Sequence, residues 1–128
     1  MKSENLPAES ITEVEGLEVK RVFTKPEISA YDSFNYTKKK SIIRNPDGSI
    51  VFEMDNVEVP ESWSQIATDI LAQKYFRKRG VPTTNKDGTV TLGAETSIKQ
   101  IVHRIVGCWT HWGTEDGYFN SSQDSKSF

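Results

Sequence analysis

The sequence is poor in cysteine, and this limits the chemistry that the chain can carry. Among its 128 residues there is one cysteine, Cys108. A single thiol can form neither an internal disulfide nor a multi-cysteine metal site, which is typical of a protein from a reducing compartment. Stability must therefore come from packing or from a partner.

Long apolar runs are also missing. No stretch approaches the ~20 apolar residues that a membrane-spanning helix needs, and the polar, acidic start of the sequence contains no secretory apolar region. Only 35% of the residues are hydrophobic, so we expect a small core and marginal stability in isolation. These features predict a soluble, cytoplasmic chain that has no membrane partner.

The sequence has no excess of one charge and no complete active-site motif. Its 16 basic and 18 acidic residues leave a net charge of −2, so charge gives no general reason to expect nucleic acid as a partner. A Gly-rich phosphate loop, a dinucleotide fingerprint and a Ser/His/Asp constellation are all absent from the sequence. We therefore predict neither a catalytic residue nor a cofactor-binding residue in this chain.

The clearest pattern that is present predicts an amphipathic helix in the middle of the chain. Pro60 favours extended geometry at the residue before it, and Ser62 with Gln65 has the spacing of a capping box. Apolar residues follow at steps of three and four and predict a buried stripe on a helix over about 62–76: Trp63, Ile66, Ala67, Ile70, Leu71 and Tyr75.

A second amphipathic helix is predicted at about 97–112. Ser97 and Gln100 repeat the capping-box spacing, and Gly113 is expected to end the helix. We expect the two helices to pack as an antiparallel pair. The apolar stripe of the second helix consists of Ile98, Ile101, Val102, Ile105, Trp109 and Trp112.

Two turn sequences predict β-structure, which makes the fold class α+β. The first, Asn45-Pro46-Asp47-Gly48, lies between Ser41–Arg44 and Ser49–Phe52 and predicts a β-hairpin. The second, Asn85-Lys86-Asp87-Gly88, lies between the two helices. It fits a short hairpin and an inserted loop about equally well.

The first predicted helix also carries a resemblance to a known family. The segment Val57–Phe76, with the sequence VEVPESWSQIATDILAQKYF, resembles the N-terminal region of adenosylcobalamin-dependent (class II) ribonucleotide reductases. The resemblance covers roughly 21–128, but Tyr36-Thr37 stands where the family pattern has a Trp-Glu pair. Flanking segments agree in order: Arg21–Thr24, Tyr31-Asp32, Asp47-Gly48 with Val51–Glu53, Glu95–Ser97, His103–Ile105, Trp112-Gly113 and Gly117–Phe119.

The resemblance implies an enzyme that reduces ribonucleotides to deoxyribonucleotides for DNA synthesis with adenosylcobalamin (vitamin B12). In that family the reaction needs a thiyl radical on one cysteine and a separate pair of cysteines, so a chain with Cys108 alone is predicted to be inactive in isolation. The resemblance implies a segment that supports or docks onto the catalytic barrel, encoded by the same gene or present as a separate chain. Cofactor and ribonucleotide would bind only in the complete enzyme.

This interpretation divides the chain and names candidate contacts. Residues 1–20 would be a mobile acidic lead-in, 21–119 the reductase N-terminal domain, and 120–128 a polar tail. Aromatic candidates for docking, for each of which ordinary core packing is the alternative, are Tyr75, Phe76, Trp112, Tyr118 and Phe119. Basic candidates for contact with a phosphate or an acidic partner, unless they only complement the helix dipole, are Lys74, Arg77, Lys78 and Arg79.

A metal site is not predicted. His103, Cys108 and His111 lie on one predicted helix, but the spacing brings at most two of them to one face, and two ligands are too few for a structural site.

The alternative function is a stand-alone binding or regulatory module that engages a reductase or a nucleic acid. It would be stable alone, whereas a reductase segment would gain stability from its partner.

Overall fold

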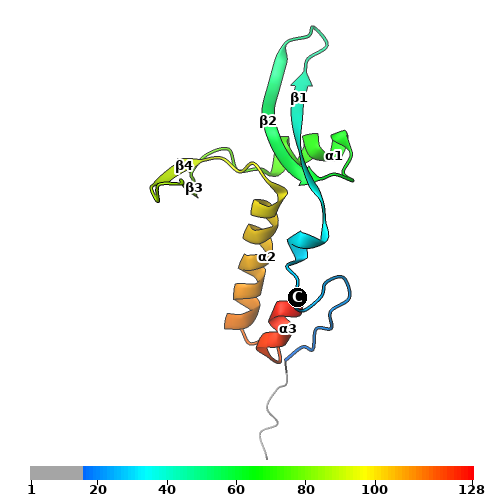
Figure 1. Ribbon diagram of the computed structural model, residues 1–128, viewed down its shortest axis with the longest axis vertical. Coiled ribbons are helices and arrows are strands. Elements are labelled where there is room, and N and C mark those ends of the chain that lie inside the picture. The colour runs from blue at the N-terminus through cyan, green and yellow to red at the C-terminus, as the bar shows by residue number, and fades with distance from the viewer. Residues whose placement is uncertain (1–15) are drawn as a thin grey trace, which may run out of the picture.

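Two antiparallel β-hairpins and one long helix determine the shape of the molecule (Figure 1). The computed structural model describes residues 16–128, so residues 1–15 of the predicted lead-in lie outside the described residues. The elements in chain order are a 3-10 helix η1 (Ala30–Ser33), β1 (Tyr36–Arg44), β2 (Ile50–Pro60), α1 (Gln65–Ile70), a π-helix η2 (Leu71–Tyr75), β3 (Val81–Thr84), β4 (Val90–Gly93), α2 (Ile98–Glu115) and α3 (Ser122–Ser127). The predicted α+β class is confirmed.

The first hairpin forms around the predicted turn, with longer strands than the sequence indicated. The strands β1 and β2 pair in antiparallel register from Tyr36 opposite Pro60 to Arg44 opposite Ile50. In the turn, the Asp47 carboxylate accepts hydrogen bonds from the backbone N–H of Ser49 at 2.9 Å and from its hydroxyl at 2.6 Å. This side chain therefore fixes the turn locally, as short polar residues do.

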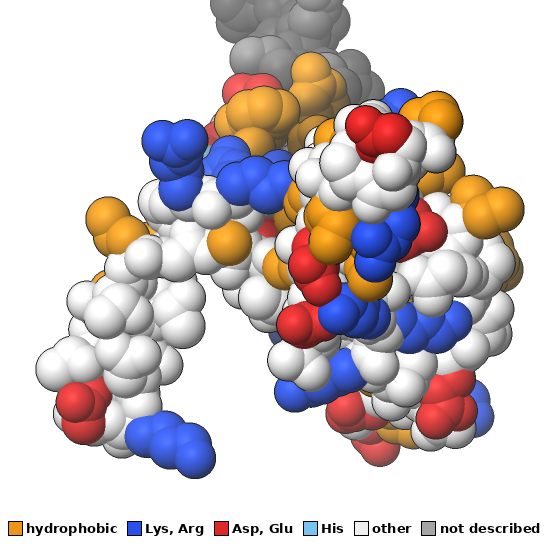
Figure 2. Space-filling model, turned by 90° about the horizontal axis from the view of Figure 1, so that it is seen from above, with side chains coloured by type: hydrophobic (Ala, Val, Ile, Leu, Met, Phe, Trp, Pro, Cys, Tyr) orange, Lys and Arg blue, Asp and Glu red, His pale blue; other side chains and the backbone are white. Residues whose placement is uncertain are grey.

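The second turn sequence also forms a hairpin, which settles the choice between a hairpin and a loop. The strands β3 and β4 pair from Val81 opposite Gly93 to Thr84 opposite Val90. The turn repeats the first one bond for bond, because Asp87 accepts hydrogen bonds from the N–H and hydroxyl of Thr89. This hairpin projects as an arm from the rest of the molecule (Figures 1 and 2).

The first helix begins later than predicted. The strand β2 continues to Pro60, and the helix is capped by Ser64, whose hydroxyl accepts a hydrogen bond from Ala67 N at 3.1 Å. The predicted capping box of Ser62 with Gln65 is therefore wrong. The Gln65 amide instead donates to the backbone oxygen of Lys40 at 2.9 Å, which ties the helix to the first hairpin.

A π-helical turn changes which residues of this helix are buried. The Phe76 N–H donates to the Leu71 carbonyl at 3.1 Å, an i→i+5 bond. Phe76 thereby takes the position above Leu71 and is only 4% exposed, whereas Tyr75 is 58% exposed. The predicted stripe is wrong at Ile66, Ile70 and Tyr75, all of which are exposed. The buried residues of this segment are Thr68, Leu71, Ala72 and Phe76.

The core lies where the first hairpin meets the start of α2. Trp109, further along α2, is 55% exposed, and Ile70 on α1 is 44% exposed. The two helices thus share the core only near Ile101 and Ile105, whereas the stripe residues Ile70 and Trp109 lie outside the core. The buried cluster consists of Val57, Val59, Leu71, Ala72, Phe76 and Ile101, with Phe52, Met54, Trp63, Ile98 and Ile105 packed against it.

The start of α2 matches the sequence prediction, but its end does not. The capping box of Ser97 and Gln100 is present, with both reciprocal hydrogen bonds. Gly113 does not end the helix, which runs on to Glu115. Gly113 is buried against the ring of Phe119, and Gly117, with φ of 72°, follows the end of the helix instead. A glycine at this point serves close packing rather than termination.

Two glycines of α2 give a matched pair for testing this packing. A Cβ at Gly113 would lie 2.6 Å from Cε2 of Phe119, so we expect Gly113→Ala to lower the free energy of unfolding by about 1–3 kcal/mol. A Cβ at Gly107 meets nothing within 4 Å, so Gly107→Ala should raise it by roughly 0.5–1 kcal/mol through helix propensity. Urea denaturation measures both, and equal effects would contradict the packing of Phe119 on Gly113.

The first described residues pair with the last ones. The Leu17 N–H donates to the carbonyl of Tyr118 at 2.6 Å, and its own carbonyl accepts from Asn120 N at 3.1 Å. The Val19 N–H donates to the carboxylate of Asp124 in α3 at 2.8 Å. This pairing brings the segment at 16–19 against the C-terminal residues.

Among residues 16–128, no helix is long and apolar enough to cross a membrane.

Candidate functional site

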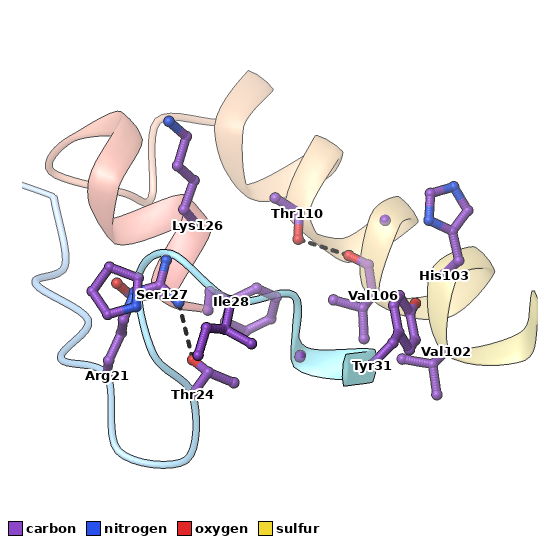
Figure 3. Close-up of a pocket in the computed structure, with 14 residues that line it drawn as sticks. Arg21, Thr24, Ile28, Tyr31, Val102, His103, Val106, Thr110, Lys126 and Ser127 are labelled. Carbon is purple, nitrogen blue, oxygen red and sulfur yellow. Dashed lines mark hydrogen bonds between the residues drawn. The ribbon is translucent and has the colours of Figure 1, made fainter. Parts of the chain in front are cut away.

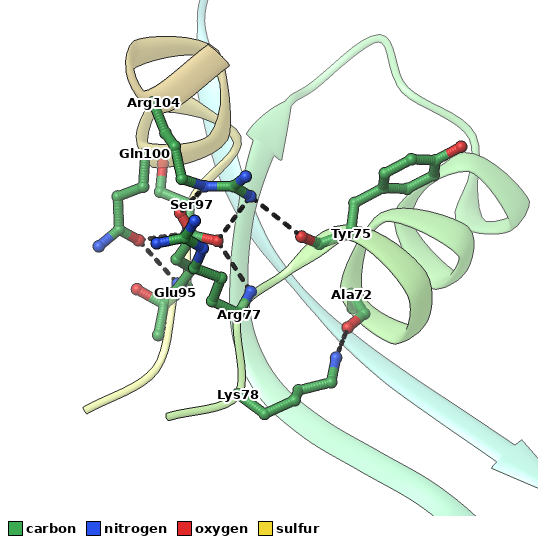
Figure 4. A network of polar contacts seen from close by, with 9 residues as sticks. Ala72, Tyr75, Arg77, Lys78, Glu95, Ser97, Gln100 and Arg104 are labelled. Carbon is green, nitrogen blue, oxygen red and sulfur yellow. Dashed lines mark hydrogen bonds and ion pairs between the residues drawn. The ribbon is translucent and has the colours of Figure 1, made fainter. Parts of the chain in front are cut away.

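An ion pair with a buried carboxylate and a half-buried guanidinium lies where η2 ends and α2 begins (Figure 4). Glu95 is only 2% exposed, and its carboxylate accepts from Nη2 of Arg104 at 3.0 Å and from Nε at 3.2 Å. The backbone N–H of Arg77 also donates to Glu95 at 2.8 Å, and Glu95 N donates to the Arg77 carbonyl at 2.9 Å. Arg104 reaches the Tyr75 carbonyl at 3.3 Å as well. The ion pair thus connects the end of η2 to α2.

These contacts decide the charge of Glu95. Burial would raise the pKa of its carboxyl, but the hydrogen bonds from Arg104 and from the backbone of Arg77 outweigh burial and hold the pKa below its usual range. The carboxylate is therefore charged near neutral pH. It is fully occupied by these donors, so its role is to fix the two elements in place rather than to exchange protons.

The four predicted basic candidates do not act alike. The Lys78 ammonium donates to the carbonyl of Ala72 and lies 4.7 Å from the ring centre of Phe52. Partial burial of the ammonium lowers the pKa of Lys78. Lys74, Arg77 and Arg79 are exposed, and Lys78 is exposed too in spite of these contacts. Lys and Arg side chains gather at the base of the β3–β4 arm (Figure 2). Lys78 is thus engaged within the chain, while the others remain candidates for a phosphate or an acidic partner.

A cavity of about 580 Å³ lies between the segment at 21–31, α2 and α3 (Figure 3). The guanidinium of Arg21 donates through Nη1 to Thr24 at 3.0 Å, and its Nε is buried without an acceptor. The side chains of Lys126 and His103 point away from the centre of the cavity in this view. The described residues that line the cavity include no Asp, Glu or Cys side chain, and its titratable side chains are Arg21, Tyr31, His103 and Lys126.

An almost purely apolar groove runs beside α1. We call it the α1 groove; its volume is about 400 Å³, and it is lined by Trp63, Ala67, Ile70, Leu71, Tyr75 and Ile101. Ile66 of the same helix is 72% exposed. The groove thus joins core residues to exposed apolar side chains.

A second apolar surface lies at the opposite end of α2. We call it the aromatic pocket; its volume is about 330 Å³, and it is lined by Leu17, Val19, Trp109, Trp112, Gly113, Tyr118, Phe119 and Phe128. The rings of Phe119 and Phe128 lie 5.4 Å apart between centres. Trp112 and Tyr118 are 57% and 60% exposed.

The five predicted docking aromatics therefore divide among three places. Tyr75 lines the α1 groove, and Phe76 lies in the core. The other three line the aromatic pocket: Trp112, Tyr118 and Phe119. Sequence reasoning missed the exposed Ile66 and Ile70, since it assigned both to a buried stripe. It also missed the pairing of Glu95 with Arg104, for which residues nine positions apart give no local signal.

Comparison with known proteins identifies the family. Residues 37–128 match the family described as class II vitamin B12-dependent ribonucleotide reductase. The vitamin B12-dependent ribonucleotide reductase of Bradyrhizobium diazoefficiens is 40% identical over 88% of this chain. The chain belongs to the class II vitamin B12-dependent ribonucleotide reductase family. The reductases of Agrobacterium fabrum and Streptomyces coelicolor are 36% and 37% identical, each over 88% of this chain.

The chain spans only about a tenth of these reductases. Its match covers 11% of the length of each of the three relatives, and in them this region is part of a single long chain. The resemblance of the sequence to the N-terminal region of a class II reductase is thereby confirmed.

The family name implies cobalamin chemistry, which can be compared with the thiol and metal-ligating side chains of this chain. Cys108 is the one thiol in the sequence and is exposed on α2. Among residues 16–128, no group of three or more His, Cys, Asp and Glu side chains could hold a metal ion. We therefore derive no step that passes through cobalamin from this part of the reductase.

Proposed function

We propose that this chain is the N-terminal part of a vitamin B12-dependent ribonucleotide reductase and that it docks onto the catalytic part without reducing ribonucleotides itself. The complete enzyme would reduce ribonucleotides with adenosylcobalamin, and the catalytic cysteines would lie in the part that this chain does not span. The observation that carries the proposal is the single exposed cysteine in a chain of this family. The division at residues 20 and 119 stays a prediction.

The exposed apolar side chains support docking. Ile66 and Tyr75 beside the α1 groove, and Trp109, Trp112 and Tyr118 at the aromatic pocket, are each more than half exposed. Single exposed apolar residues are common, but contiguous patches mark interaction sites. Two such patches on one small chain favour burial against a larger body.

Purification from the native source tests this function. When the tagged chain is purified from this source, a ribonucleotide reductase activity that depends on added adenosylcobalamin should co-purify with it. The recombinant chain of residues 1–128 should show no such activity. Activity of the recombinant chain alone would contradict the proposal. So would a purified sample that contains the chain in quantity but lacks the activity.

The stand-alone module has less support. The basic run at 74–79 would be its binding surface, but Lys78 in that run is engaged with Ala72 and Phe52. A nucleic-acid function would require binding that weakens steeply with salt. We expect no such binding, and a filter-binding assay at two salt concentrations would detect it.

A further inference from the structure

We infer that the α1 groove receives an apolar segment from the catalytic part of the reductase and that the π-helical turn η2 builds this groove. The inference rests on the proposed function and specifies the surface and the partner for docking. It concerns Ile66, Ile70 and Tyr75, which the sequence pattern placed in a buried stripe.

The π turn is what places Tyr75 in the groove. In an α-helix, Tyr75 would lie above Leu71, four positions earlier, and face the core. The i→i+5 bond from Phe76 N to the Leu71 carbonyl puts Phe76 in that position instead. Tyr75 turns outward and lines the groove beside Leu71. π turns are rare and are found frequently at functional sites.

The helix α1 is buried on one side and has exposed apolar residues on another side. Thr68 is buried toward the core, and Leu71 and Ala72 of the following π turn are buried with it. On the other side, Ile66 is 72% exposed and Ile70 is 44% exposed. Exposed apolar side chains that lie next to one another mark interaction sites. Ile66 and Ile70, one turn apart on the open side of α1, therefore extend the apolar surface of the α1 groove.

The chemistry of the groove selects an apolar occupant. Its floor includes the core residues Leu71 and Ile101, and its wall includes Ile70 and Tyr75. The nearby carboxylate of Asp69 already accepts from the Ser41 hydroxyl at 2.6 Å and from the Gln65 amide at 2.9 Å. A polar occupant would lose its water without gaining partners, which is unfavourable.

We take the catalytic part of the reductase as the occupant, because in the relatives it belongs to the same polypeptide as the region that matches this chain. The matched region makes up 11% of the reductase of Bradyrhizobium diazoefficiens, so the other 89% of that polypeptide is tethered to it. Tethering raises the effective concentration of a neighbouring segment far above that of a second copy. A second copy of this chain is therefore the competing occupant that the test must distinguish.

Hydroxyl-radical footprinting compares side-chain exposure in the recombinant chain of residues 1–128 and in the reductase assembly purified from the native source. We expect labelling of Ile66, Ile70 and Tyr75 to fall at least fivefold in the assembly. Phe76, which is 4% exposed, should be labelled weakly in both samples and so verifies that the chain is folded in each.

Two variants in the assembly sharpen the test. Ile70→Ser should restore labelling of Tyr75 at least threefold, because a hydroxyl is unfavourable in an apolar contact. The exposed Gln73 lies in the same π turn but does not line the groove, so Gln73→Ser should leave Tyr75 protected. Equal labelling of Tyr75 in the two variants would overturn the role of the groove.

The other outcomes separate this inference from the proposed function. Protection confined to Trp112 and Tyr118 would leave docking intact and overturn the α1 groove as its site. Full labelling at both surfaces would overturn docking and the groove together. Protection that appears in the recombinant chain as its concentration rises would identify a second copy as the occupant, which would also overturn the inference.

Discussion

Phe76→Ala is expected to lower the free energy of unfolding by about 3–5 kcal/mol, the usual cost of truncating a buried aromatic side chain. Phe76 is 4% exposed and shares the core with Leu71 and Ala72, which lie on the same π turn. Removing the ring leaves a cavity between η2 and β2, and surrounding residues of a packed core fill such a cavity only in part.

The neighbouring residue is the matched control. Tyr75 is 58% exposed, so Tyr75→Ala should change the unfolding free energy of the isolated chain by less than about 1 kcal/mol. Urea denaturation of both variants measures the difference. A small effect of Phe76→Ala together with a large effect of Tyr75→Ala would mean that the chain forms a regular α-helix here, with the two rings exchanged.

Arg104→Met is expected to lower the free energy of unfolding at neutral pH by about 3 kcal/mol, because it leaves the carboxylate of Glu95 buried without its counter-charge. Glu95 would keep only the backbone N–H of Arg77 as a donor, at 2.8 Å. Arg79→Met is the control, since Arg79 is exposed, and it should have an effect of less than about 0.5 kcal/mol.

The pH dependence of the variant distinguishes lost charge pairing from lost packing. In the unaltered chain the pKa of Glu95 lies below its usual value, so its contribution is present above that value and disappears as the pH falls through the lowered pKa. Without Arg104, burial dominates and should raise the pKa of Glu95. Acidification should then neutralise the buried carboxylate and reduce the destabilisation of the variant. The stability difference between the two proteins should shrink from pH 7 to pH 4.5. Parallel pH profiles would contradict the role of the ion pair.

Features that a few adjacent residues determine were predictable from the sequence. The turns at Asp47 and Asp87 are fixed by hydrogen bonds to the residue two positions ahead, and the capping box at Ser97 involves Gln100 three positions later. In each case the interacting groups lie within one turn of chain. Sequence spacing therefore contains the needed information.

Features that depend on distant partners or on one extra residue were not predictable. The first helix begins after Ser64 rather than Ser62, because β2 pairs with β1 as far as Pro60. The choice between Tyr75 and Phe76 as the buried ring depends on a single i→i+5 hydrogen bond that adjacent aromatics do not signal. The predicted docking set was consequently divided between the core and two surfaces.

The split of the docking candidates has a structural consequence. The α1 groove and the aromatic pocket lie at opposite ends of α2, an 18-residue helix, which at 1.5 Å per residue is about 27 Å long. A partner that covers both surfaces must therefore extend along the whole of α2. A large catalytic part fits this requirement better than a short peptide does.

Docking of this chain onto the catalytic part of the reductase can be measured directly. Sedimentation velocity of an equimolar mixture tests it most directly, with the chain of residues 1–128 and the reductase polypeptide from which the matching N-terminal region has been deleted. Retained cobalamin binding would verify that the truncated polypeptide is folded. The account predicts one faster-sedimenting species that contains both chains. Two independent boundaries at micromolar concentrations would contradict it.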